Sequence, residues 1–197
     1  MRWKGLRSAL GLLLAASSSG CTYEEADFPS QEELYDEQVS EGAFLLQAGR
    51  GSFTVEVDGR GMLAPEVNVG RYTSPDDRAM RGTAFSRPVN LAIEGGRVSG
   101  LVGTTPVQLT VTRESGALRA RGLIRGRLSD FTLGEGRLNG QIGACGYDLA
   151  WTARAGYEGA RSCGGLPENA TVRIPAELTR WSDAEVAAAL AILLGSG

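Results

Sequence analysis

The chain has 197 residues, and its 20 basic and 23 acidic side chains give a formal net charge of −3. It contains no histidine, which excludes nucleophiles activated by a Ser–His or Cys–His pair and removes the commonest zinc ligand. Its three cysteines do not have metal-ligand spacing. We therefore expect no metal and no cofactor.

The first 20 residues are typical of a signal peptide. Arg2, Lys4 and Arg7 give a positive start, a short apolar run follows from 9 to 16, and small residues precede Cys21. The run is too short to cross a bilayer, which requires roughly 20 apolar residues, and its length fits the apolar region of a signal peptide.

The sequence Ser18-Ser19-Gly20-Cys21 resembles the lipobox of bacterial lipoproteins, and the resemblance is confined to residues 1–25. It implies that Cys21 is lipidated and becomes the mature N-terminus, so that a membrane is contacted through an N-terminal lipid. Thr22 further implies the outer membrane of a Gram-negative cell envelope, because lipoproteins kept at the inner membrane commonly carry Asp there. Ser18 stands where the motif usually has Leu, so ordinary signal cleavage nearby is the alternative.

Residues 21–41 are expected to form an acidic tether between the lipid and a folded domain. Eight acidic residues and no basic residue lie between 22 and 41, and the sequence at 30–33 fits a capping box for a short helix from 31 to about 38. An acidic docking tail is the alternative interpretation. The residues after 41 carry 17 arginines and 15 acids, a nearly neutral balance that does not support nucleic acid as a partner.

Residues 42–197 are expected to form one domain. The ranges 43–48 and 52–57 predict a hairpin pair, and Asp58-Gly59 is expected to form the next turn. Further strands are expected near 81–86, 88–94 and 171–174. Residues 60–80 are expected to be irregular, with an exposed loop at 72–77.

A unit of about forty residues occurs twice in this domain. Residues 96–121 match residues 136–161 without a gap, with nine identities in 26 positions. Each copy predicts three strands, at 96–103, 105–113 and 117–125 in the first copy, because apolar and polar residues alternate between Gly-containing turns. The shared parity predicts six buried side chains, three in each copy: Val107, Leu109, Val111, Tyr147, Leu149 and Trp151. Chance matching of Gly-rich strands is the alternative.

The fold class predicted from these patterns is all-β: a single antiparallel barrel or sandwich with an internal 40-residue duplication and a short C-terminal helix. The helix is expected over 183–194, because Ser182-Asp183-Ala184-Glu185 forms a capping box before an apolar face. It is too short to cross a membrane. We expect it to cover an open end or a face of the sheet.

The cysteine count predicts a disulfide. If Cys21 carries a lipid, Cys145 and Cys163 remain as a pair, and they fall opposite each other in a hairpin that turns near 154–156. The bond would stabilise the fold by about 3 kcal/mol on the chain-entropy model. Two buried free thiols are the alternative.

Four arginines are candidates for anion binding. Arg119, Arg121, Arg125 and Arg127 share one parity, so a continuous strand would place them in a row on one face, where an anionic glycan or lipid headgroup could dock. A solvated outer face is the alternative. Carboxylate catalysis has its best candidates in Asp130 and Asp148, followed by the loop acids at 76 and 77.

The sequence therefore predicts a lipid-anchored cell-envelope protein with a structural or binding role and no catalytic site. The first alternative is a hydrolase of envelope polysaccharide that uses paired carboxylates. The second is a barrel that carries a small apolar ligand.

Overall fold

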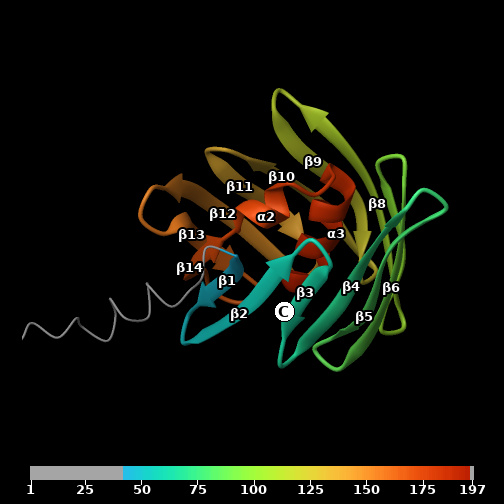
Figure 1. The fold of residues 1–197 in the computed structure, drawn as a ribbon. Helices are drawn as coiled ribbons and strands as arrows, with labels where there is room; N and C mark the ends of the chain where they lie inside the picture. The colour runs from blue at the N-terminus through green and yellow to red at the C-terminus, as the bar shows by residue number, and fades with distance from the viewer. Residues whose placement is uncertain (1–41, 196–197) are drawn as a thin grey trace, which may run out of the picture.

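The computed structural model describes residues 42–195, which form one closed antiparallel barrel of fourteen strands (Figure 1). Every strand pairs with its neighbours in sequence, and β1 closes the barrel against β14. Closure leaves no strand edge unpaired, and it selects the barrel from the two architectures that the sequence left open. The strands are β1 (Ala43–Ala48), β2 (Gly51–Asp58), β3 (Gly61–Ala64), β4 (Val67–Ser74), β5 (Asp77–Ala84), β6 (Arg87–Glu94), β7 (Arg97–Val102), β8 (Thr105–Glu114), β9 (Ala117–Ile124), β10 (Arg127–Gly134), β11 (Arg137–Ile142), β12 (Cys145–Thr152), β13 (Gly156–Ser162) and β14 (Glu168–Arg173).

Residues 60–80 are not irregular, so that expectation was wrong. They contain β3, β4 and the first half of β5, joined by tight turns at 65–66 and 75–76. These strands are short or rich in polar residues, and their pattern is therefore weak in the sequence. The expected exposed loop at 72–77 is the tip of the β4–β5 hairpin, and its residues are exposed. The boundary expected between 86 and 88 lies at a turn formed by Phe85 and Ser86.

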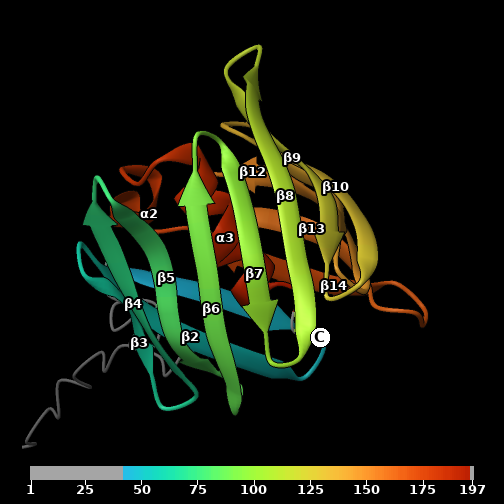
Figure 2. The same cartoon turned by 90° about the vertical axis from the view of Figure 1, so that its right-hand side faces the viewer.

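Two helices follow the last strand: α2 (Ala176–Thr179) and α3 (Asp183–Leu193). We had expected the C-terminal helix to cover an end or a face of the sheet, but α3 lies inside the barrel (Figures 1 and 2). All of its residues after Asp183 are buried, and it contacts strands β5 to β9. A helix that is apolar on every side is stable only when it is surrounded. Within residues 42–195, no helix is long and apolar enough to span a membrane.

The two ends of the barrel differ, because the chain enters the barrel at one end and α3 finishes near the other. The entry end carries the turns at 59–60, 75–76, 95–96, 115–116, 135–136 and 153–155, and the chain leaves β14 there to form α2 and α3. The far end carries the turns at 49–50, 65–66, 85–86, 103–104, 125–126 and 143–144 and the connection at 163–167. Gly195 reaches the far end, because its carbonyl oxygen would lie 3.0 Å from a Cβ placed on Gly143.

In every odd-numbered strand from β3 to β13, one glycine lies close to the backbone of the neighbouring strand. The six residues are Gly61, Gly82, Gly100, Gly122, Gly140 and Gly159. At Gly122, φ is +149°, and an added Cβ would lie 1.9 Å from the carbonyl oxygen of Gln108 on β8. Only glycine allows the two strands to approach this closely. Repeated glycine kinks are a known means of bending a sheet so that it closes.

The duplication is visible in the first two strands of each unit. The amide of Val111 donates to the carbonyl of Gly96, and forty residues later the amide of Trp151 donates to the carbonyl of Gly136. Five of the six side chains predicted to be buried are buried. Trp151 is the exception, with 52% of its surface exposed. It lies at the entry end, where β12 stops at Thr152, whereas the matching strand β8 continues to Glu114.

The third strands of the two units are paired differently. In the first unit Glu114 lies opposite Ala117, and in the second Thr152 lies opposite Gly156, so the pairing is displaced by three residues. An odd displacement turns side chains to the other face of the sheet. As a result Arg121 lies on the outer face, opposite Thr110, while its equivalent Arg161 lies opposite the buried Tyr147.

Candidate functional sites at the two ends of the barrel

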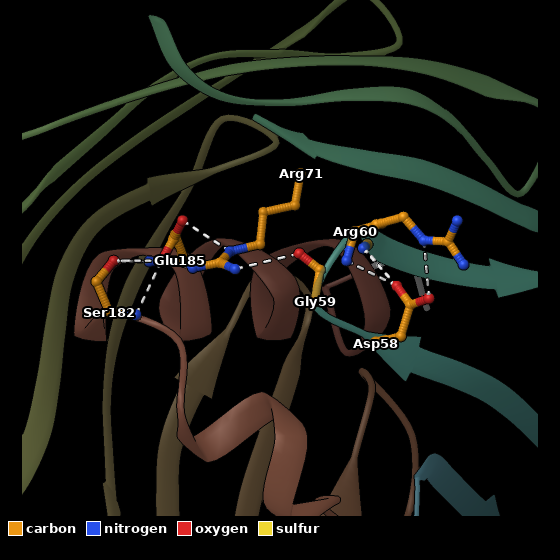
Figure 3. Close-up of polar contacts among 7 residues, drawn as sticks. Asp58, Gly59, Arg60, Arg71, Ser182 and Glu185 are labelled. Atoms are coloured by element: carbon orange, nitrogen blue, oxygen red, sulfur yellow. Dashed lines mark hydrogen bonds and ion pairs between the residues drawn. The ribbon is translucent and has the colours of Figure 1, made fainter. Parts of the chain in front are cut away.

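At the entry end, Arg71 connects β4 to the start of α3 (Figure 3). Its Nε and Nη2 donate to the two carboxylate oxygens of Glu185 at 2.9 and 3.0 Å, and its Nη1 donates to the Gly59 carbonyl at 3.2 Å. The guanidinium also lies 5.0 Å from the ring centroid of Trp181. The Glu185 carboxylate accepts from the amide and hydroxyl of Ser182, which completes the predicted capping box.

Burial raises the pKa of the Glu185 carboxyl, but the hydrogen bonds from Arg71 and Ser182 outweigh burial, so its pKa lies below the ordinary value. Its negative charge also lies at the positive end of the helix dipole. The polar groups of this network form hydrogen bonds with one another. The exception is the indole Nε1 of Trp181, which is buried without a partner. We conclude that the network fixes the helix in the barrel.

The four candidate arginines do not form a row on one strand, because β9 ends at Ile124 and Arg125 occupies the turn to β10. Arg119 and Arg121 lie on the outer face of β9. The Asp130 carboxylate accepts from Arg119 Nε at 3.1 Å and from Arg121 Nε at 3.2 Å. The hydrogen bond from Arg119 is the main reason that the pKa of Asp130 is lowered. Glu114 also accepts from Arg119 Nη1 at 3.4 Å, so both arginines are paired with carboxylates within the fold.

The other two candidates lie at the far end, near Arg87 at the start of β6. Arg125 Nη1 donates to the Gly195 carbonyl at 3.2 Å, a favourable place for a cation because α3 ends there. Burial lowers the pKa of the Arg125 guanidinium, and the charges of Arg87 and Arg127 lower it further. Among the described residues, no carboxylate pairs with Arg87, Arg125 or Arg127. This far-end arginine cluster, Arg87, Arg125 and Arg127, concentrates positive charge.

The carboxylates considered for catalysis do not face each other across a cleft. Asp130 lies on β10 and Asp148 on β12, with β11 between them. Two strand spacings separate them by roughly 10 Å. Asp148 accepts from Arg137 Nε at 3.0 Å, an ion pair on the outer face. The loop acid Asp77 is bound by Arg81 through both oxygens.

The cysteines predicted to pair lie at disulfide distance. The Sγ atoms of Cys145 and Cys163 are 2.00 Å apart and their Cα atoms 4.1 Å apart. They lie at the far end, at the end of the β12–β13 ladder, as the hairpin geometry predicted. Cys21, the signal peptide and the acidic tether with its expected helix lie outside the described residues.

A cavity of about 320 Å³ opens at the far end and was not foreseen from the sequence. Its apolar lining includes Leu46, Phe53 and Phe85 from the strands and their turns and Leu193 from the end of α3. Arg161 is the only charged residue among its lining residues. The strand displacement described above turned Arg161 inward, and the sequence gives no direct sign of that displacement. Larger hollows of about 530 and 520 Å³ lie over β2–β4 and β6–β9.

Comparison of the chain with protein-family models, curated proteins and solved structures found no significant match.

Proposed function

We propose that this protein is a lipid-anchored component of the cell envelope, held at the outer membrane through Cys21, with a barrel that has a structural or binding role and no catalytic site. The anchor rests on the positive start, the short apolar run and the Gly20-Cys21 junction of the sequence. The role of the barrel rests on the place of α3.

One observation supports a structural or binding role best: α3 fills the barrel. Phe44, Phe131 and Leu149 of the strands and Leu190 of the helix have less than 2% of their surface exposed. Barrels that carry apolar ligands enclose them in an open interior, and here the chain itself occupies that space. The groups that a partner can reach therefore lie on the outer face and at the two ends.

The far-end arginine cluster favours an anionic partner. Arginine binds phosphate and carboxylate groups through paired hydrogen bonds, and these three guanidiniums are not neutralised by carboxylates of the described fold. Because the protein is proposed to be anchored in a membrane, an anionic lipid headgroup is the partner we propose. An anionic glycan is the alternative that the experiment distinguishes.

Metabolic labelling with a clickable fatty acid tests the anchor. The wild type should be labelled and should fractionate with the outer membrane, whereas Cys21→Ala should be unlabelled and released. Equal labelling of both chains contradicts the proposal. Cys163→Ser is the matched control, because it also replaces a cysteine but should leave labelling unchanged.

Cosedimentation with vesicles tests the partner. The full chain with Cys21→Ala should bind vesicles containing phosphatidylglycerol more tightly than vesicles of phosphatidylcholine alone. The double change Arg87→Gln and Arg127→Gln should weaken this binding, and more so at low salt. The control is Arg78→Gln with Arg154→Gln, which removes the same charge at the entry end. Equal loss in both double variants would show nonspecific charge attraction, and binding only to a sulfated or uronic polysaccharide would identify a glycan partner.

A further inference from the structure

The cavity at the far end combines an apolar wall with a single cation, Arg161, whose side chain is mostly but not fully buried. Phe53 and Phe85 meet edge to face, with ring centroids 5.5 Å apart, and Leu46 and Leu193 complete the apolar lining. Ligand sites are commonly cavities of about 300–1,000 Å³ lined by apolar and aromatic side chains, with few polar groups that fix orientation. At about 320 Å³, this cavity is at the small end of that range.

Phe85 has an unusual backbone conformation. Its φ is +50° and that of Ser86 is +61°, so both residues of this two-residue turn are left-handed. Such turns strongly favour Asn and Gly, because a bulky side chain is strained in that region. Strained residues are often found at functional sites. The chain tolerates the strain at a position that places an aromatic ring on the cavity wall.

One nitrogen of the Arg161 guanidinium has no hydrogen-bond partner. Its Nε is buried and has no partner, although buried donors are nearly always satisfied. Nη1 donates to Glu168 Oε1 at 3.5 Å, a long hydrogen bond, and Nη2 donates to Cys145 Sγ at 3.5 Å. The guanidinium also lies 5.9 Å from the ring centroid of Tyr147. Glu168 is more exposed than Arg161, with 41% against 14% of its side chain accessible, so water weakens its hold on the arginine.

We propose that this cavity is a binding site for an amphipathic carboxylate, a medium-chain fatty acid whose carboxylate pairs with Arg161 and whose chain lies against Phe53 and Phe85. The proposal deepens the binding role proposed above by naming a ligand class. A carboxylate fits the planar donor fork of arginine, and Arg161 lines the cavity. If each heavy atom takes the ~30 Å³ that water takes in the liquid, the cavity holds about ten heavy atoms. Octanoate has that size.

Calorimetry with sodium octanoate tests the site, using the full chain with Cys21→Ala, which needs no detergent. We expect one octanoate per chain, and octanol, which has the same chain without the charge, should bind more weakly. Arg161→Gln should weaken octanoate binding at least about tenfold, because a hydrogen bond between charged groups is lost, and should leave octanol binding unchanged. Arg78→Gln removes an equal charge at the entry end and should behave like the parent chain.

A second variant keeps the test decisive if Arg161→Gln fails to fold. Phe85→Asn suits the left-handed backbone and removes the ring, so it should leave the melting temperature equal or higher while weakening octanoate and octanol alike. Octanoate binding that is unchanged in Arg161→Gln or in Phe85→Asn overturns the site. Tighter binding of a hexapeptide ending in Leu than of octanoate overturns the ligand class. Neither result affects the anchor, which the labelling experiment tests separately.

Discussion

The ion pair between Arg71 and Glu185 provides the sharpest test of how the helix is held inside the barrel. Only 4% of the Glu185 side chain and 18% of the Arg71 side chain are exposed. Replacing Glu185 by Gln leaves the capping box in place, because Gln can serve as its fourth residue. The change therefore isolates the loss of charge, and Arg71 is left as a buried cation without a counterion.

We expect Glu185→Gln to lower the free energy of unfolding by about 3 kcal/mol, at the lower end of the range for breaking a buried ion pair. The lower end applies because Arg71 keeps its hydrogen bond to the Gly59 carbonyl and its contact with Trp181. Urea unfolding of the Cys21→Ala chain measures this loss. The matched control is Asp183→Asn, which breaks the exposed pair with Arg113 at the same helix end and should cost less than about 1 kcal/mol.

The effect should depend on pH in one direction. The folded-state pKa of Glu185 lies below its ordinary value, so its ionised form stabilises the fold fully above the unfolded pKa of about 4.3. That contribution is lost as the pH falls through the folded-state pKa. The difference between wild type and Glu185→Gln should therefore be largest near neutral pH and should shrink below about pH 4. Two results would refute the conclusion that the buried Arg71–Glu185 ion pair holds α3 in the barrel. One is an equal loss of unfolding free energy in Glu185→Gln and Asp183→Asn. The other is a difference between wild type and Glu185→Gln that does not change with pH.

Three further predictions concern the strands. Gly122→Ala should cost about 3 kcal/mol because the new Cβ meets a backbone oxygen, whereas Gly136→Ala, with open space around it, should stay within about 0.5 kcal/mol in the same urea assay. Trp151→Ala should change the free energy of unfolding by about 1 kcal/mol or less and Leu149→Ala by about 2–5 kcal/mol; the reverse order would mean that Trp151 is part of the core. Cys163→Ser should cost about 2–5 kcal/mol, and an unchanged midpoint in this variant would show that the disulfide is not formed.

The strands could be predicted where apolar and polar residues alternate and turn residues bound the same segment. The duplicated units were found because Gly-containing turns punctuate runs such as Val107, Leu109 and Val111, whose parity alone assigns them to the inner face. The region at 60–80 was missed because β3 has only four residues and the inward residue of β4 at position 71 is an arginine. An inward arginine breaks the alternating pattern unless its partner, here Glu185 on a distant helix, is known.

The candidate site was less predictable because it depends on pairing between strands. The three-residue displacement that turns Arg161 into the cavity follows from the longer turn at 153–155 and the earlier end of β12. A repeat alignment without gaps treats Arg121 and Arg161 as equivalent, although they lie on opposite faces of the barrel. The turn between β5 and β6 was expected near residue 87 and lies at Phe85 and Ser86. The sequence did not place it there because neither residue strongly favours a left-handed backbone.

The position of α3 inside the barrel follows from the residues on its surface, which are apolar in every direction around the helix axis. A helix that covers a sheet has a polar side, and successive residues of a helix point 100° apart. Ala187, Ala188 and Ala189 therefore face three different directions, and each is fully buried. Substituting any one of them by Leu should cost about 1–3 kcal/mol through overpacking, as measured by urea unfolding. On a helix that covers the outside of the sheet, at least one of the three would face solvent and accept Leu within about 0.5 kcal/mol. Small side chains on every side are what allow a helix to fit within a barrel whose walls are already lined with Leu, Ile and Phe.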